Sequence, residues 1–186
     1  YGIAGWAEND RFVFLYDRYD IWKIDPSGEK VPVSVTLASG RKNRIQYRYI
    51  KTDPEEEYIS TGKKILLRAF NQVTMESGFC TADFGQVREP VTLIMGKYSF
   101  GFPRKAKNSD KLLWSRESVS EFPDWWTSNT EFGHQRRISD ANPQQKDYVW
   151  PTCTMVEWTS FSGETLKGLL YQPENLDPAK KYPMIV

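Results

Sequence analysis

The chain has little histidine and little cysteine: one His (His134) and two Cys (Cys80 and Cys153) among 186 residues. Zinc and related metals are held by clusters of these residue types at short, regular spacings. The two cysteines have no short-range partner pattern, which excludes a disulfide framework and a Cys-based zinc site. We therefore predict no metal site, no cofactor site and two unpaired thiols, with a single Cys80–Cys153 disulfide as the alternative.

An excess of one charge sign and a long apolar run are also lacking. Charged residues make up 26% of the chain, yet the formal net charge is only +1. Nucleic-acid-binding domains usually carry a strongly basic patch, and the pair Arg136-Arg137 is too small to form one. No segment approaches the roughly 18 apolar residues of a membrane-spanning helix. The sequence thus predicts no nucleic-acid partner and no membrane span.

Helical periodicity is scarce, whereas aromatic residues are abundant, at 15% of the chain. Aromatic side chains are enriched in β-strands, where they fit a pleated, half-buried surface. In "RFVFLYDRYDIWKID" the apolar residues 12–16 point to both faces of one strand, and Ile21, Trp22 and Ile24 continue as a second strand after a polar turn. The composition and this pattern predict an all-β fold.

A similar unit recurs along the chain. Apolar strands that should lie inside their sheets are predicted at residues 11–16, 64–70 and 112–115. Their starts are about 45 to 55 residues apart, which is the period of a four-stranded propeller blade. We therefore predict a partial β-propeller of about three four-stranded antiparallel blades and no helix of three or more turns in residues 1–150. A β-sandwich is the alternative.

The character of the sequence changes after residue 140. Asn142-Pro143 and the polar residues that follow predict a linker between residues 140 and 152. Residues 154–159 and 166–171 then alternate as two strands of a hairpin turned at Ser162-Gly163. A proline-punctuated arm leads to a last expected strand at residues 184–186. We divide the chain into domains 1–150 and 151–186.

About the last 50 residues resemble a known family. "ISDANP" at residues 138–143, "WTSFSGETLKGLLYQP" at residues 158–173 and "KKYPMIV" at residues 180–186 are similar to the junction in prolyl oligopeptidase family serine peptidases, in particular their dipeptidyl-peptidase branch. The upstream "DIWKID" at residues 20–25 resembles propeller blades more generally. In this family a β-propeller restricts access to an α/β-hydrolase domain.

The resemblance implies that residues 1–150 are the last propeller blades and that residues 151–186 are the hairpin, arm and first strand of a truncated hydrolase domain. It implies a peptide substrate for the whole protein, further blades and a hydrolase domain as partners, and a periplasmic or other extracytoplasmic location. It leaves a homodimer of the whole protein open. The chain itself would contribute substrate gating and domain docking without catalysis.

Within the chain, no residue set matches a catalytic site. "GKYSFG" places Gly96 three residues before Ser99, whereas a nucleophile elbow needs glycines two residues to each side of the serine. His134 lies in a predicted surface loop. The run Glu55, Glu56, Glu57 is interpreted as a solvated charge run, although dipeptidyl peptidases use paired glutamates to hold a substrate amine. We therefore predict no catalytic residues in this chain.

The pair Trp125-Trp126 is the basis for an alternative function, a non-catalytic binding module. Adjacent strand residues point to opposite faces, so one tryptophan faces each side of its sheet. Packing between blades is the favoured role. An aromatic platform would instead fit a free-standing β-propeller or β-sandwich module that recognises a protein or a glycan.

Overall fold

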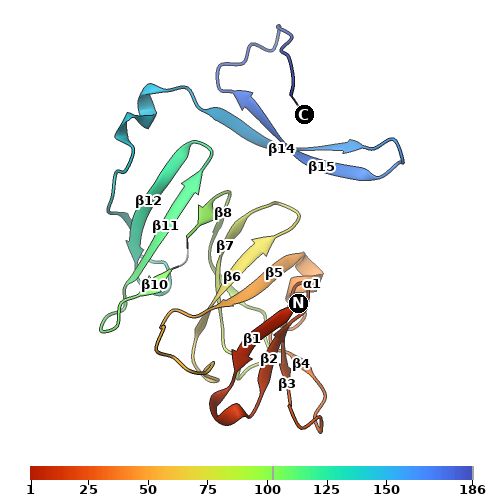
Figure 1. Ribbon diagram of the computed structural model, residues 1–186, viewed down its shortest axis with the longest axis vertical. Coiled ribbons are helices and arrows are strands. Elements are labelled where there is room, and N and C mark those ends of the chain that lie inside the picture. Colours follow the sequence, from red (N-terminus) through yellow and green to blue (C-terminus); the bar gives the residue numbers. More distant parts are fainter. Residues whose placement is uncertain (102, 186) are drawn as a thin grey trace.

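The computed structural model describes residues 1–101 and 103–185. Strands dominate this part of the chain, and its α-helix α1 (Ser39–Asn43) is a little over one turn long. The all-β prediction is confirmed, as is the expectation that no helix of three turns interrupts the described residues up to 150. Three antiparallel sheets and a hairpin follow one another along the long axis of the molecule (Figure 1).

The first sheet consists of β1 (Gly2–Trp6), β2 (Val13–Tyr16), β3 (Ile21–Ile24) and β4 (Val33–Ser34), in that order. All its pairings are antiparallel. After β3 the chain turns with a hydrogen bond from the Gly28 N–H to the Asp25 carbonyl, at 3.0 Å. Gly28 has a φ of +77°, a conformation that glycine adopts without steric cost.

The second sheet repeats this simple order with β5 (Ile45–Ile50), β6 (Ile65–Asn71), β7 (Ser77–Ala82) and β8 (Val91–Gly96). β6 is covered on both sides and is largely apolar on both faces, with Arg68 as a charged exception. Alternate residues of β6 join different buried clusters: Leu67 lies in a cluster shared with the first sheet, and Leu66 in a cluster shared with the third. The second sheet is therefore the central layer of the molecule.

The third sheet has the order β10 (Arg104–Lys105), β11 (Leu112–Ser118), β12 (Glu121–Ser128) and β13 (Arg136–Arg137). The short strand β9 (Ser99–Phe100) pairs with the other end of β11, so β9 and β10 share one edge position. The main buried side chain of the third sheet is Trp114, which is fully inaccessible to solvent.

The predicted strands at 11–16, 64–70 and 112–115 correspond to β2, β6 and β11, each flanked by strands on both sides. The strands that precede them, β1 and β5, were not predicted. β1 contains two glycines, which give no side-chain pattern, whereas β5 does alternate polar with apolar residues and its strand pattern was overlooked. Both are stabilised by long-range pairing, β1 with β2 and β5 with β6.

Residues after β13 form a 3₁₀ helix, η2 (Pro143–Asp147), where a linker was expected. None of its residues is buried, in keeping with a linker. It is nevertheless attached to the third sheet. The Gln145 side chain accepts the Phe122 N–H at 2.9 Å and donates to the Ser120 carbonyl at 2.6 Å. Trp150 Nε1 donates to the Gln145 carbonyl at 2.8 Å.

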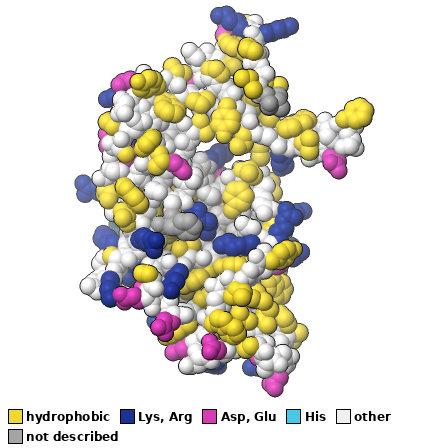
Figure 2. All heavy atoms as spheres, viewed as in Figure 1, with side chains coloured by type: hydrophobic (Ala, Val, Ile, Leu, Met, Phe, Trp, Pro, Cys, Tyr) yellow, Lys and Arg dark blue, Asp and Glu magenta, His cyan; other side chains and the backbone are white. Residues whose placement is uncertain are grey.

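β14 (Pro151–Thr159) and β15 (Thr165–Pro173) form the predicted hairpin; β14 begins earlier than expected, and β15 is longer at both ends. The hairpin projects from the sheets, and hydrophobic side chains line it (Figures 1 and 2). The expected strand at residues 184–186 is not seen: Met184 and Ile185 are exposed and unpaired by any described strand, and Val186 lies outside the described residues. A strand needs a hydrogen-bonded neighbour, which the described residues do not provide here.

Candidate functional site

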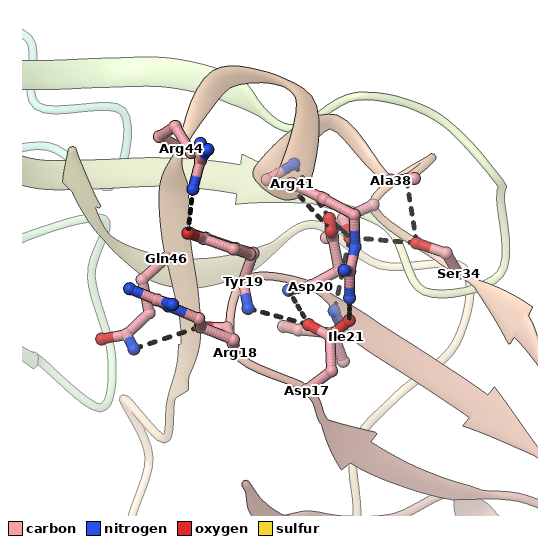
Figure 3. Close-up of polar contacts among 12 residues, drawn as sticks. Asp17, Arg18, Tyr19, Asp20, Ile21, Ser34, Ala38, Arg41, Arg44 and Gln46 are labelled. Atoms are coloured by element: carbon pink, nitrogen blue, oxygen red, sulfur yellow. Dashed lines mark hydrogen bonds and ion pairs between the residues drawn. The ribbon is translucent and has the colours of Figure 1, made fainter. Parts of the chain in front are cut away.

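A polar cluster around the buried Asp20, here called the polar junction, connects the first sheet to α1 and contains Asp17, Asp20, Thr36, Gly40 and Arg41 (Figure 3). The fully buried Asp20 carboxylate accepts hydrogen bonds from Thr36 Oγ1 at 2.7 Å and from the backbone N–H groups of Gly40 and Arg41 at 2.9 Å each. The buried carboxylate is thus fully hydrogen-bonded, as buried charges require. The polar junction therefore has a structural role.

Asp17 completes the polar junction from the turn between β2 and β3. Burial acts to raise the pKa of Asp17, but hydrogen bonds from the Asp20 N–H and the Arg41 guanidinium outweigh burial and lower it. The turn also contacts β5 directly: the Tyr47 N–H donates to the Tyr19 carbonyl at 2.8 Å. The junction therefore holds the first two sheets together.

The two residues considered for nucleophilic chemistry do not form a catalytic pair. Ser99 is exposed on β9, opposite Glu117 of β11. His134 is exposed in the loop before β13, with a left-handed φ of 52°. In the described part of the chain no hydrogen bond joins their side chains. A serine nucleophile needs a base within hydrogen-bond reach, so this arrangement supports no acyl transfer.

The three consecutive glutamates have different environments. Glu55 forms an exposed ion pair with Lys107 at 2.9 Å. Glu56 is half-buried and accepts a hydrogen bond from the Tyr49 hydroxyl at 2.9 Å. Burial and the Glu56 carboxylate both raise the pKa of Tyr49. The solvated-run interpretation holds for Glu55 and Glu57, whereas Glu56 belongs to the wall of a cleft.

The paired tryptophans point to opposite faces, as predicted. Trp125 is half exposed on the outer face of the third sheet. Trp126 stacks on Trp114 with ring centroids 5.6 Å apart, and the Arg116 guanidinium lies 4.1 Å from the Trp126 ring. Arg116 is also paired with Glu121 at 2.7 Å. Trp126 therefore has a packing role.

Cys80 and Cys153 are free thiols in different strands, β7 and β14. Burial raises the pKa of the Cys80 thiol to about 11, so Cys80 is protonated and unreactive near neutral pH. Among the described residues, no group of three or more His, Cys, Asp or Glu is placed to hold a metal ion. None of the described helices is long and apolar enough to span a membrane.

A cleft between the second and third sheets, here called the inter-sheet cleft, is the candidate binding site. Its volume is about 260 Å³. Its floor is apolar, with Ile50, Leu66 and Leu112 buried. Its rim carries charged side chains from four separate segments. The charged rim residues are Glu56, Lys63, Lys64, Lys105 and Glu131.

Sequence reasoning did not find this cleft. Its rim residues lie between positions 56 and 131 in loops and strand ends, and no motif joins them. Only the stacking of the second sheet on the third brings them together. The cleft combines cationic and hydroxyl groups above an apolar floor, an arrangement suited to binding.

No family model and no curated protein matches the sequence. Among solved structures, the fold is similar to the AtxE2 isopeptidase. A variant with Astexin3-dC4 bound has a TM-score of 0.60 and 13% identity over 93% of this chain. The apo form has a TM-score of 0.59 and 14% identity over 95% of this chain. The chain spans 26% of the length of each of these proteins. At this identity the likeness concerns the fold alone.

Proposed function

We propose that the chain is a non-catalytic part of a serine peptidase that cleaves peptides, with residues 1–150 as the last β-propeller blades and residues 151–186 as the first strands of the hydrolase domain. The observation that carries this proposal is the fold likeness to an isopeptidase over 93% of the chain. The "ISDANP" and "WTSFSGETLKGLLYQP" segments independently suggest a prolyl oligopeptidase-type junction.

The arrangement of the sheets supports the propeller interpretation. Successive four-stranded antiparallel sheets that share buried clusters are what neighbouring blades provide. The first and third sheets each leave an apolar outer face partly open. Ile3 is 67% exposed on the first sheet and Trp125 is 50% exposed on the third. Further blades would cover both faces.

The hairpin supports a docking role. Directly paired residues of an antiparallel pair point to the same face. One face therefore presents Met155 with Leu169, and the other presents Trp158 with Leu166. Leu169 and Trp158 are each about half exposed. A ribbon that is apolar on both faces is stabilised when another layer covers it, and the hydrolase domain would supply that layer.

In the proposed reaction, a serine attacks the peptide carbonyl, the amine leaves, and water releases the acyl group. This chemistry needs a nucleophile, a base and oxyanion donors. The described residues hold no such set, so we assign this chain to substrate access and domain docking.

A fluorophosphonate probe, which labels activated serines, tests the proposal. The isolated chain should remain unlabelled. The protein encoded by the full reading frame should be labelled at a serine in a Gly-x-Ser-x-Gly segment after Val186. An encoded protein without such a serine would overturn the proposal in favour of a free-standing binding module. Labelling of the isolated chain at Ser99, abolished by His134→Ala, would also overturn it.

A further inference from the structure

The charges of the inter-sheet cleft are unevenly compensated. Lys64, just before β6, pairs with Glu131, in the loop between β12 and β13, at 2.5 Å, so this ion pair joins the two rims. The Glu56 carboxylate is occupied by the Tyr49 hydroxyl. Lys64 thus neutralises Glu131, whereas Glu56 is hydrogen-bonded by a neutral hydroxyl and keeps its negative charge on the rim.

Two rim lysines form no direct ion pair in the described part of the chain, although Lys105, after the hydrogen bonds from Thr130, helps to lower the pKa of the Asp110 carboxyl. Within residues 1–101 and 103–185, no ion pair involves Lys63 or Lys105. Lys105 donates only to the carbonyl of its neighbour Ala106, at 3.1 Å. Two ammonium groups therefore border one cleft, one from the segment before β6 and one from β10. Counted over all the charged rim residues, three lysines against two glutamates leave a net charge of +1, which favours an anion.

The floor of the cleft indicates what the anion is attached to. Ile50, Leu66 and Leu112 are 5%, 8% and 2% exposed, and Leu93 adds to the same surface. An apolar floor can cover an aliphatic or aromatic side chain. It also lowers the local dielectric, so that nearby charges interact more strongly than in bulk water.

The volume of the cleft limits the size of the ligand. Pockets for whole small molecules typically enclose about 300–1,000 Å³. The inter-sheet cleft, at about 260 Å³, lies just below that range. It therefore suits one terminal residue and not an extended ligand.

We propose that the inter-sheet cleft binds the C-terminal carboxylate of a peptide that ends in an apolar residue. Lys63 and Lys105 hold the carboxylate from opposite sheets, and the last side chain lies on the apolar floor. The choice of a peptide as ligand rests on the proposed function, whereas the charge and the floor do not. Lysine acts here as a point charge, and its hydrogen bonds to carboxylate are strengthened by the charges on both partners.

Calorimetric titration of the full chain with N-acetyl-Gly-Leu tests this assignment against the same dipeptide with an amidated C-terminus. We expect the acid to bind at least tenfold more tightly than the amide. The preference should shrink as salt is raised, because exposed charges are screened. Equal binding of acid and amide, or no binding of either, would refute the assignment.

Matched variants locate the site. The double substitution Lys63→Gln with Lys105→Gln should weaken binding of the acid at least tenfold. Lys30→Gln with Lys42→Gln removes the same charge from the first sheet and its helix and should leave binding unchanged. Circular dichroism confirms that both variants are folded. Equal loss in both pairs would reduce the effect to net charge and overturn the site.

Inorganic phosphate distinguishes a general anion site. Competition by phosphate at concentrations similar to those of the peptide acid would contradict a carboxylate-specific cleft with an apolar floor. The two proposals fail separately. If the chain binds the acid selectively but the encoded protein has no labelled serine, the peptidase proposal is refuted and the carboxylate site in the inter-sheet cleft is retained. If the encoded protein has a labelled serine but the chain does not prefer the acid, the carboxylate site is refuted and the peptidase proposal is retained.

Discussion

The Asp20 carboxylate accepts the backbone N–H of Gly40 at 2.9 Å, across 20 residues of sequence and at zero solvent exposure. This contact sets the start of α1 against the turn between β2 and β3. Since the same turn contacts β5, one buried carboxylate determines how the first two sheets meet. Loss of this carboxylate is therefore expected to destabilise both the first and the second sheet.

The substitution Asp20→Asn keeps the shape of the side chain but turns one acceptor oxygen into a donor. It would face backbone N–H groups of Gly40 and Arg41, both of which are donors. We expect the free energy of unfolding to fall by about 2–4 kcal/mol, as for other broken buried networks. Urea titration measures the change. Asp147→Asn, at an exposed position of η2, should change it by less than about 0.5 kcal/mol. Similar effects from the two would contradict a special role for Asp20.

Gly40→Ala should destabilise the chain although alanine is the better helix former. A Cβ at this position would lie 2.7 Å from the Ile45 carbonyl oxygen and 2.8 Å from Asp20 Oδ1. Neither group can move without breaking a buried contact, so we expect a loss of about 1–3 kcal/mol, typical of overpacking. Gly28→Asn is the control, because open space surrounds Gly28 and asparagine tolerates its φ. A stabilised Gly40→Ala variant would show that α1 is not packed tightly against the junction.

Stability should fall at alkaline pH. Burial raises the pKa of Cys80 from 9.0 to about 11 and that of Tyr47 from 10.0 to about 12. The folded state therefore keeps both protons at a pH where the unfolded chain releases them. The associated stability is fully present below about pH 9 and is lost as pH rises from 9 to 12.

Each group can contribute up to about 1.4 kcal/mol per pH unit to the slope. Urea unfolding measured between pH 8 and 11 should show the decline, and Cys80→Ala should reduce its slope. Cys153→Ala, which removes a half-buried thiol, serves as the control. A flat profile for the unchanged chain would mean that Cys80 and Tyr47 are accessible to solvent.

Limited trypsin digestion should cut the chain after Lys146 before it cuts within any of the three sheets. This residue lies in η2, where no side chain is buried. Because the Gln145 side chain ties this segment to the third sheet, Gln145→Ala should speed the cut several-fold. Mass spectrometry of the early fragments identifies the site. A first cut within residues 12–24 would show that the proposed domain division is wrong.

The sequence predicted elements whose signal is local and missed those that depend on distant partners. The turn at Asp17 and the hairpin at Gly163 were predicted because polar and glycine-containing turns have their own chemistry. β1 was missed because its two glycines have no side chain to pattern, so its pairing with β2 decides its conformation.

The inter-sheet cleft was missed for a related reason. Lys63 and Lys105 have no unusual feature in the sequence, since lysines at turns are common on protein surfaces. Their significance comes from the stacking of two sheets around Leu66 and Leu112. The environment of Glu56 could not be predicted from the sequence for the same reason. Its hydrogen bond with Tyr49 is what distinguishes it from the solvated Glu55 and Glu57.

β6 supplies Leu67 to one buried cluster and Leu66 to the other, and this makes the energetics of the molecule those of a short linear array. In such arrays, stability is a sum of unit terms and nearest-neighbour interface terms. A defect in a terminal unit then frays one end, while a defect in the middle unit uncouples both interfaces at once. Tolerance to substitution should accordingly be lowest in the second sheet and should rise toward each end.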